Sequence, residues 1–259
     1  MQINQVYNEN CLDTMARMPD GFIDLTVTSP PYDNLRTYNG YSFDFENVAQ
    51  ELYRVTKQGG VVVWVVGDAT INGSETGTSF TQALYFKECG FNLHDTMIWN
   101  KKNPTPNDTR QNRYRQAFEY MFIFSKGKPM TCNYIYEPCK FYGLSAEKLG
   151  SQRKKNGDRR TDIERRRKKQ VVKKYKTRSN VWFFAVGGDK KHPAVFPEQL
   201  ANDHIITWSN EGDLIYDPFM GSGTTAKMAI ANQRNWIGSE ISSEYCEIIK
   251  ERIKQTKLL

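Results

Sequence analysis

Residues 61–66 read Val-Val-Val-Trp-Val-Val, an uninterrupted apolar run rich in β-branched side chains. Such a run is typical of a strand buried on both faces, as in parallel sheets that helices cover on each side. Residues 44–56 precede it and carry apolar side chains at helical spacing behind Asp44, a candidate N-cap. We expect Gly59 and Gly60 to end that helix. The two segments together predict a helix that leads into a strand of a parallel sheet.

The same alternation continues along the chain. It predicts strands at residues 23–28, 92–99, 118–124, 214–216 and 235–241, and helices at residues 80–88, 197–206, 224–231 and from about residue 243. Strands and helices in this order predict an α/β fold with a doubly wound, mostly parallel sheet. With 259 residues, the chain is long enough for one such core and a small appended part.

Residues 126–189 interrupt the pattern, because no periodicity persists through the basic stretch at residues 151–176. The formal net charge is +7, and most of the excess lies in this stretch. A local concentration of cations favours a polyanionic partner. The alternative is a solvated helix or a disordered insertion, which is what most charge runs are.

A glycine turn separates the predicted strand at residues 214–216 from the helix at residues 224–231, in the segment Asp217-Pro218-Phe219-Met220-Gly221-Ser222-Gly223. Glycines let the backbone approach a ligand, and the N–H groups at a helix start attract anions. Glu240 ends the last strand about twenty residues later, the spacing of a ribose-binding acid in nucleotide-binding folds. The missing third glycine and P-loop lysine disfavour a dinucleotide or a triphosphate.

The turn Ser29-Pro30-Pro31-Tyr32, called the proline turn below, follows the predicted strand at residues 23–28. Ligands of open α/β sheets gather at the carboxyl edge of the sheet. Two prolines restrict this loop, so the Ser29 hydroxyl and the Pro30 carbonyl can accept hydrogen bonds from the amino group of a flat ring that stacks on Tyr32. Such bonds favour a tetrahedral nitrogen whose lone pair can attack an electrophile. The alternative is a rigid surface turn.

These motifs resemble those of the DNA amino-methyltransferases that form N6-methyladenine or N4-methylcytosine. Residues 28–32 are similar to the catalytic motif of that family and residues 217–225 to its cofactor motif, with further likeness at residues 118–127, 192–200 and 236–241. The catalytic motif comes first, which is the order of the β class. The resemblance implies a Rossmann-like methyltransferase sheet and S-adenosylmethionine as the cofactor. Methyltransferases that act on protein glutamine, and many that act on RNA, resemble the opposite order and are disfavoured.

The resemblance also assigns roles to individual residues. It implies that the target base is held by Ser29, Pro30, Pro31 and Tyr32. It implies that the cofactor is bound by Asn10, Asp217, Phe219, Gly221, Ser222, Gly223, Thr224, Thr225 and Glu240 and covered by His192 and Phe196. The family often has Asp at the position of Asn10, and the alternative for His192 is an ordinary helix-entry residue. No cluster has metal-ligand spacing, so no metal is expected.

Ser29, where adenine-N6 enzymes carry Asp, favours cytosine N4 as the target, with adenine N6 as the alternative. A base within double-stranded DNA reaches such a pocket only by flipping out. The residues expected to contact DNA are Arg110, Arg113, Arg115, Arg153, Lys154, Arg159, Arg160 and Arg165. The predicted organisation is a catalytic half at residues 1–127, a target-recognition insertion at residues 128–190 and a cofactor-binding half at residues 191–259.

A protein without catalytic activity that binds DNA is the alternative from another class, although both motifs are intact. The resemblance allows a homodimer and a cognate restriction endonuclease as partners. The five cysteines are scattered, the N-terminus has no signal-peptide pattern, and the longest apolar run is too short to span a bilayer. We therefore expect no membrane association and a cytoplasmic protein encoded by a bacterium or a phage.

Overall fold

The structure is a computed structural model that describes residues 1–31, 43–104, 112–145, 156–158, 171–189, 192–195 and 197–256. Its contacts divide the chain into two compact units. The first unit comprises Met1–Asn133 and Asn180–Leu259, and the second comprises Tyr134–Ser179. The first unit contains a large sheet and its covering helices, and the second contains a small hairpin.

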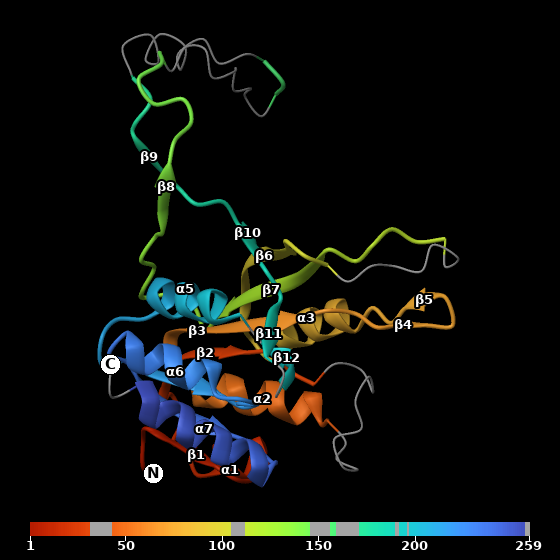
Figure 1. Ribbon diagram of the computed structural model, residues 1–259, viewed down its shortest axis with the longest axis vertical. Helices are drawn as coiled ribbons and strands as arrows, with labels where there is room; N and C mark the ends of the chain where they lie inside the picture. Colours follow the sequence, from red (N-terminus) through yellow and green to blue (C-terminus); the bar gives the residue numbers. More distant parts are fainter. Residues whose placement is uncertain are drawn as a thin grey trace. The chain divides into compact units, whose positions relative to one another are not determined.

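Eight strands form the large sheet (Figure 1), and their order is β1-β14-β13-β2-β3-β7-β6-β10. These strands are β1 (Gln5–Tyr7), β2 (Ile23–Thr28), β3 (Thr56–Val66), β6 (Asn92–Lys101), β7 (Phe118–Ser125), β10 (Val181–Phe184), β13 (Leu214–Asp217) and β14 (Asn235–Ser239). All run in one direction except β7, which pairs antiparallel with both of its neighbours. The predicted α/β fold with a mostly parallel sheet is confirmed.

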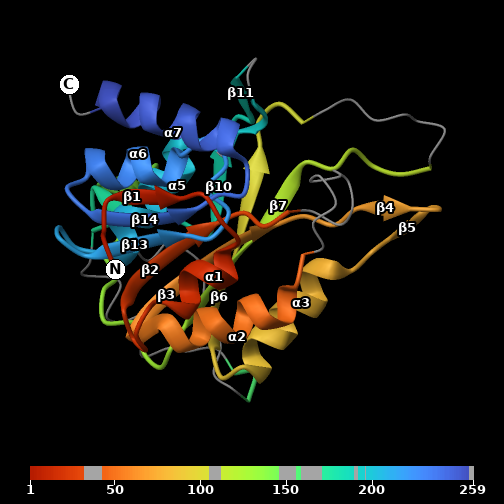
Figure 2. The same cartoon turned by 90° about the horizontal axis from the view of Figure 1, so that it is seen from below.

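Helices cover both faces of this sheet (Figure 2). One face carries α1 (Cys11–Ala16), α2 (Phe45–Val55) and α3 (Thr78–Glu88), and the other carries α5 (Glu198–Trp208), α6 (Thr224–Ala231) and α7 (Ser243–Thr256). Between the layers the apolar side chains of the strands are buried, and Trp64 is fully inaccessible. The uninterrupted valine run around Trp64 therefore has the two-sided burial that its composition predicts.

The junction between α2 and β3 differs from the expectation at its glycines. Asp44 caps α2 as predicted, with its carboxylate accepting a hydrogen bond from the Asn47 N–H at 3.3 Å. However, the helix already ends at Val55, and Gly59 lies within β3 instead of closing the helix. Pairing with β2 is irregular there, and Gly59 has φ +80°. Extra residues bulge out of register, and glycine adopts the left-handed conformation that the bulge needs.

Several short elements carry too few residues for a periodic signal, and the sequence did not predict them. Besides β1, α1 and β10, these are β4 (Thr70–Ile71), β5 (Ser74–Glu75), β8 (Tyr136–Pro138), β9 (Tyr175–Thr177), β11 (Gly187–Asp189) and β12 (His192–Val195). Three two-stranded pairs result, β4 with β5, β8 with β9 and β11 with β12. No helix in the described part of the chain is long and apolar enough to cross a membrane.

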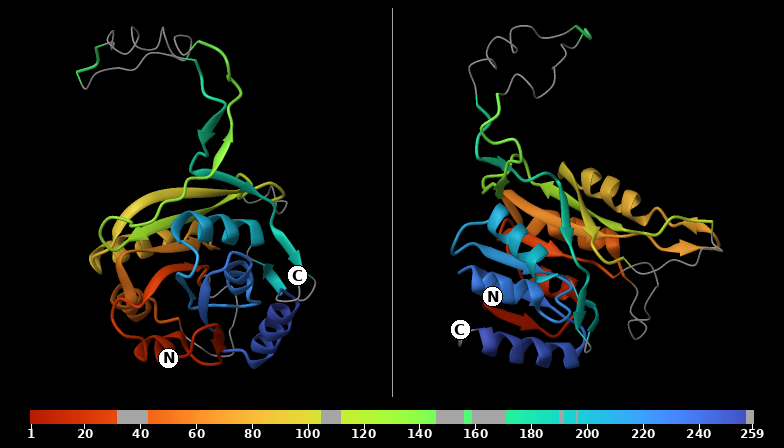
Figure 3. Two further views of the ribbon diagram at one scale, coloured as in Figure 1. Left: turned by 90° about the vertical axis from the view of Figure 1, so that its left-hand side faces the viewer. Right: turned by 45° about the horizontal axis from the view of Figure 1, so that its top comes forward.

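The second unit is built on the antiparallel hairpin of β8 and β9, which Figure 3 shows from two directions. Glu137 and Lys176 lie opposite each other and form an ion pair of 2.8 Å. Tyr136 precedes Glu137 on β8, and Tyr175 precedes Lys176 on β9. Both tyrosines are largely exposed, at 62% and 52%. The described part of this unit therefore presents aromatic rings on its surface.

Candidate active site

Two segments far apart in the sequence meet at the carboxyl ends of β2 and β13, which are neighbours in the sheet. Thr28, the last residue of β2, donates its hydroxyl to Asp217 Oδ1 at 2.7 Å. Thr225, in the first turn of α6, donates its hydroxyl to Asp217 Oδ2 at 2.7 Å and lies 3.3 Å from the Val27 carbonyl oxygen. The strand that leads into Ser29 is thus joined directly to the glycine turn. The predicted base-binding and cofactor-binding segments share one edge of the sheet.

Asp217 is the link between these segments. Its side chain is buried, and besides the two threonine hydroxyls it accepts a hydrogen bond from the Phe219 N–H at 3.1 Å. Burial raises the pKa of Asp217 above its ordinary value, while the hydrogen bonds from Thr28 and Thr225 act in the opposite direction. Because protein groups engage both of its carboxylate oxygens, Asp217 holds the glycine turn in place against the end of β2.

Glu240 lies at the carboxyl end of β14, on the other side of the glycine turn. Its Oε2 accepts a hydrogen bond from the Gly221 N–H and its Oε1 from the Ser242 N–H, each at 2.8 Å. Burial raises the pKa of Glu240 above its ordinary value, and these two backbone bonds oppose that effect. An ionised carboxylate has about four acceptor sites. Two of them hold Glu240 in place, and the remainder can accept hydrogen bonds from a ligand.

The remaining polar side chains of the glycine turn point into the protein. Ser222 and Thr224 are buried, and their hydroxyl oxygens accept hydrogen bonds from Arg252 at 3.0 and 3.3 Å. Gly223 precedes α6 with φ +83°, and a Cβ at this position would lie 3.0 Å from Ile249 Cγ1. This position therefore strongly favours glycine. The part of the turn that faces the sheet edge is mainly its backbone.

Phe219 and Asn10 are two further cofactor candidates of the first unit. Phe219 is half-buried, and its ring packs edge-on against Phe43 and Trp64, with ring centroids 5.3 and 6.2 Å apart. Asn10 caps α1, with its Oδ1 accepting a hydrogen bond from the Leu12 N–H at 2.9 Å. It follows β1, the strand next to β14, so it shares the sheet edge with Glu240.

The other predicted residues are placed as follows. Ser29 and Pro31 are half-buried and Pro30 is buried at the end of β2. His192 begins β12. Arg115 is exposed, whereas Arg113 bonds to the β4–β5 hairpin through the Gly73 carbonyl and lies 3.5 Å from Glu75. Outside the described residues lie Tyr32, Arg110, Arg153, Lys154, Arg159, Arg160, Arg165 and Phe196.

Three features of this edge were missed by the sequence reasoning. One is the pairing of Thr28 with Asp217, and another is Arg252 beneath the glycine turn. The third is Asp68, which follows β3 and accepts hydrogen bonds from the Ser79 N–H at 2.8 Å and the Ser79 hydroxyl at 2.6 Å. An acid directly after a buried strand was the available signal for Asp68. Among the described residues, no group of acids, histidines and cysteines is arranged to hold a metal ion.

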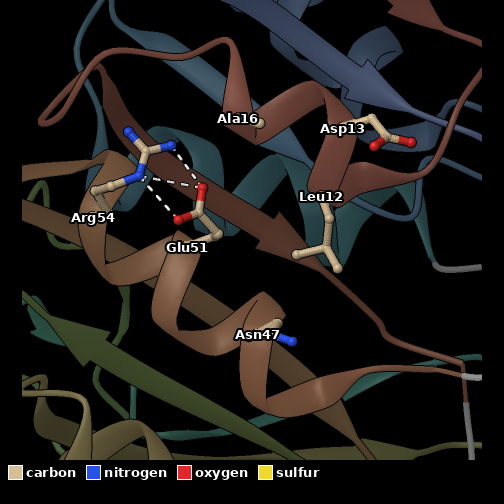
Figure 4. Close-up of a pocket in the computed structure, with 6 residues that line it drawn as sticks. All are labelled: Leu12, Asp13, Ala16, Asn47, Glu51 and Arg54. Atoms are coloured by element: carbon tan, nitrogen blue, oxygen red, sulfur yellow. Dashed lines mark hydrogen bonds and ion pairs between the residues drawn. The ribbon is translucent and has the colours of Figure 1, made fainter.

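A surface hollow between α1 and α2 is separate from this site (Figure 4). Its lining consists of Leu12, Asp13, Ala16, Asn47, Glu51 and Arg54. None of these is a predicted site residue, and Arg54 is already bonded to Glu51 and to the carbonyl oxygens of Met15 and Met18. The charge of Arg54 in this hollow is therefore already paired with Glu51, and the lining residues lack the converging polar groups found at the sheet edge.

Comparison with known proteins adds the following. A family model described as DNA methylase matches residues 23–251. The orphan methyltransferase M.BamHII of Bacillus amyloliquefaciens is 58% identical over 249 residues, covering 93% of this chain and 92% of that protein. The type II methyltransferase M.MthZI of Methanothermobacter thermautotrophicus is 28% identical, covering 98% and 77%. The solved structure of the PvuII DNA methyltransferase, described as cytosine-N4-specific, shares the fold with a TM-score of 0.69 at 21% identity, covering 95% and 85%.

Proposed function

This chain belongs to the DNA methylase family, and we propose that it transfers a methyl group from S-adenosylmethionine to the exocyclic N4 of a cytosine in double-stranded DNA. Membership makes it a DNA methyltransferase, and adenine N6 is the alternative target. The observation that carries the proposal is the bridge from Thr28 through Asp217 to Thr225, with both hydrogen bonds at 2.7 Å. It brings the proline turn and the glycine turn to one place, as a transfer between two bound molecules requires.

The residues around the glycine turn fit S-adenosylmethionine. Glu240 is held in place by the Gly221 and Ser242 N–H groups and keeps acceptor capacity, which suits the hydroxyls of a ribose. Phe219 offers a half-buried aromatic ring at the same edge, and Asn10 follows β1 at that edge. Bound there, S-adenosylmethionine supplies a methyl group on a positively charged sulfur. Neighbouring structures of this fold include a Thermus thermophilus putative DNA modification methylase complexed with S-adenosylmethionine.

On the acceptor side, we assign the proline turn to the base. Ser29 and Pro30 leave the end of β2 with restricted backbone, so the Ser29 hydroxyl and the Pro30 carbonyl can each accept an N–H of the exocyclic amine. These bonds orient the nitrogen lone pair and keep the amine free of competing water. Tyr32 lies outside the described residues, and its proposed role is to stack on the base after it has flipped out of the duplex. The choice of cytosine rests on Ser29 alone.

The insertion at residues 128–190 is the proposed target-recognition part. Its described residues include exposed Tyr136 and Tyr175 together with the cations Lys173, Lys174 and Lys176. Cations contact phosphates and exposed aromatic rings stack on bases, so the composition suits a nucleic-acid surface. The basic residues expected to contact DNA stay part of this proposal. They are Arg110, Arg113, Arg115, Arg153, Lys154, Arg159, Arg160 and Arg165.

The proposal extends to partners and place of action. M.BamHII is named an orphan methyltransferase, which favours action without a cognate restriction endonuclease. The proposal also allows a homodimer as the active form of the protein. With DNA as its substrate, we propose the bacterial cytoplasm as its place of action.

The experiment that tests the function offers S-adenosylmethionine with a labelled methyl group to duplex DNA, to RNA and to a glutamine-containing peptide. Label is expected in DNA only, and nucleoside analysis of the product is expected to give N4-methylcytosine. N6-methyladenine would establish the alternative base and overturn the choice based on Ser29. Label only in RNA or peptide would overturn the DNA assignment for this chain.

A further inference from the structure

The C-terminal helix α7 reaches the underside of the glycine turn through Arg252. Its Nη1 donates hydrogen bonds to the Ser222 carbonyl and hydroxyl oxygens, both at 3.0 Å, and lies 3.3 Å from the Thr224 hydroxyl oxygen. The Arg252 side chain is only 20% exposed. Helices α6 and α7 pack together on one face of the sheet (Figure 2). The hydrogen bonds to Ser222 place the guanidinium against the glycine turn.

Glu198 of α5 holds Arg252 in that position. Its Oε1 accepts from Arg252 Nη2 at 2.5 Å and from Lys227 Nζ at 2.7 Å. Burial alone would raise the pKa of Glu198, but the hydrogen bonds from Lys227 and Arg252 outweigh it and bring the pKa below its ordinary value. A cation at the N-terminus of a helix opposes the helix dipole. Arg252 therefore depends on this carboxylate to stay beneath the first turn of α6.

The glycine turn needs such support because its backbone has little intrinsic preference. Gly221 and Gly223 both have positive φ, at +52° and +83°. Glycine loses more conformational freedom on ordering than any other residue. Glu240 restrains the Gly221 N–H from one side, and Arg252 restrains the Ser222 carbonyl from the other. Groups of the protein itself thus hold the turn at two successive residues.

We propose that Arg252, anchored by Glu198, is a positioning residue that sets the affinity of the glycine turn for S-adenosylmethionine by ordering it in advance. The inference rests on the proposed function for the identity of the cofactor. Ordering the turn beforehand lowers the entropy cost of binding. In the described contacts Arg252 does not touch the proline turn. It therefore acts on the affinity for the cofactor and leaves the rate of methyl transfer in the fully bound complex unchanged.

The test measures S-adenosylmethionine binding to the full chain by calorimetry in the absence of DNA, and kcat with both substrates saturating. Arg252→Met should raise the Kd for S-adenosylmethionine about 30-fold, and Glu198→Gln about 5-fold, given the strength of hydrogen bonds to charged groups. Arg252→Lys should raise the Kd less than Arg252→Met does. Lysine keeps the positive charge but lacks the planar set of N–H donors of the guanidinium. In all three, kcat should stay within about threefold of the wild type.

Lys250→Met is the matched control, because Lys250 lies on the same helix and forms an exposed ion pair with Glu247 at 2.7 Å. Its Kd for the cofactor should match that of the wild type. A lower melting temperature with unchanged Kd in the Arg252 variants would overturn the proposal, and so would an unchanged Kd with a lower kcat. If Arg252→Met does not fold, Arg252→Lys and Glu198→Gln decide by the same criteria.

The outcomes also separate this inference from the proposed function. Binding of S-adenosylmethionine that depends on Arg252, without methylation of DNA, would overturn the function and leave the positioning role standing. Methylation of DNA with cofactor binding that is indifferent to Arg252 would do the reverse. A wild-type chain that binds no S-adenosylmethionine would overturn both.

Discussion

The carboxyl edge of the large sheet and the β8–β9 hairpin are built in opposite ways. At the sheet edge, charged and polar groups are buried and bonded to one another, as Asp217 is to Thr28 and Thr225. On the hairpin, Tyr136 and Tyr175 are exposed and the cross-strand ion pair lies at the surface. Buried hydrogen bonds hold reacting groups in a defined geometry, whereas exposed rings and cations can adapt to a large partner. The difference is in line with our proposal that the first region carries the chemistry and the second contacts DNA.

The largest effect that would sharpen this comparison is expected at the proline turn, to which we assign the base. Tyr32→Ala should lower kcat at least about 100-fold, because a base that is poorly held seldom reaches the attack geometry. The Kd for S-adenosylmethionine should stay close to that of the wild type, since the cofactor candidates lie on segments other than the proline turn. Single-turnover kinetics and calorimetry measure the two quantities. An equal loss of both would show that Tyr32 does not act on the base.

The next largest effect concerns the buried link. Asp217→Ala should lower the free energy of unfolding by about 3 kcal/mol, because it leaves the Thr28 and Thr225 hydroxyls buried without their acceptor. Chemical denaturation measures this change. Glu211→Ala, which removes an exposed acid before β13, is the control and should have almost no effect. Similar losses in the two variants would contradict the special role given to the link.

A smaller effect is expected at the hairpin. Replacing both Tyr136 and Tyr175 by Ala should weaken DNA binding about tenfold, from the loss of stacking, with no change in cofactor affinity. Fluorescence anisotropy with a labelled duplex measures the DNA affinity. Val171→Ala, at a 63% exposed position in the same unit, is the control for a loss of apolar surface. If the double variant binds DNA as the wild type does, the hairpin rings have no part in recognition.

The smallest effect at neutral pH comes from a buried histidine in the first unit. Burial lowers the pKa of His204 from 6.5 to about 3, and its ring lies 4.6 Å from that of Trp182. Below pH 6.5 His204 takes up a proton in the unfolded chain but stays neutral in the folded chain. The free energy of unfolding therefore falls as the pH decreases. This histidine alone should remove about 1 kcal/mol between roughly pH 7 and 5.5.

Denaturation curves at several pH values measure this slope. His204→Phe should reduce this slope by about one proton. An unaltered slope in His204→Phe would show that another group governs the acid sensitivity of the packed unit.

Local patterns were sufficient for much of the fold. The valine run before Gly67 and the apolar spacing behind Asp44 predicted β3 and α2, because two-sided burial and one-sided burial leave different periodicities in sequence. The proline turn and the glycine turn were predicted to be functional segments for a similar reason. Their special backbone requires residues that few other places tolerate. The short strands were not predicted, because two to four residues are too few to show a periodic pattern.

What the sequence by itself determined is the class of fold and the family, and it also predicted the segments to which we assign the chemistry. Only the tertiary structure decided which of these segments touch. Thr28 and Asp217 are 189 residues apart, and their hydrogen bond depends on β2 and β13 being neighbours in the sheet. Arg252 likewise looks like one more cation of an amphipathic helix until α7 packs beside α6. Strand order and helix packing follow from how the whole core excludes water, and no local pattern records them.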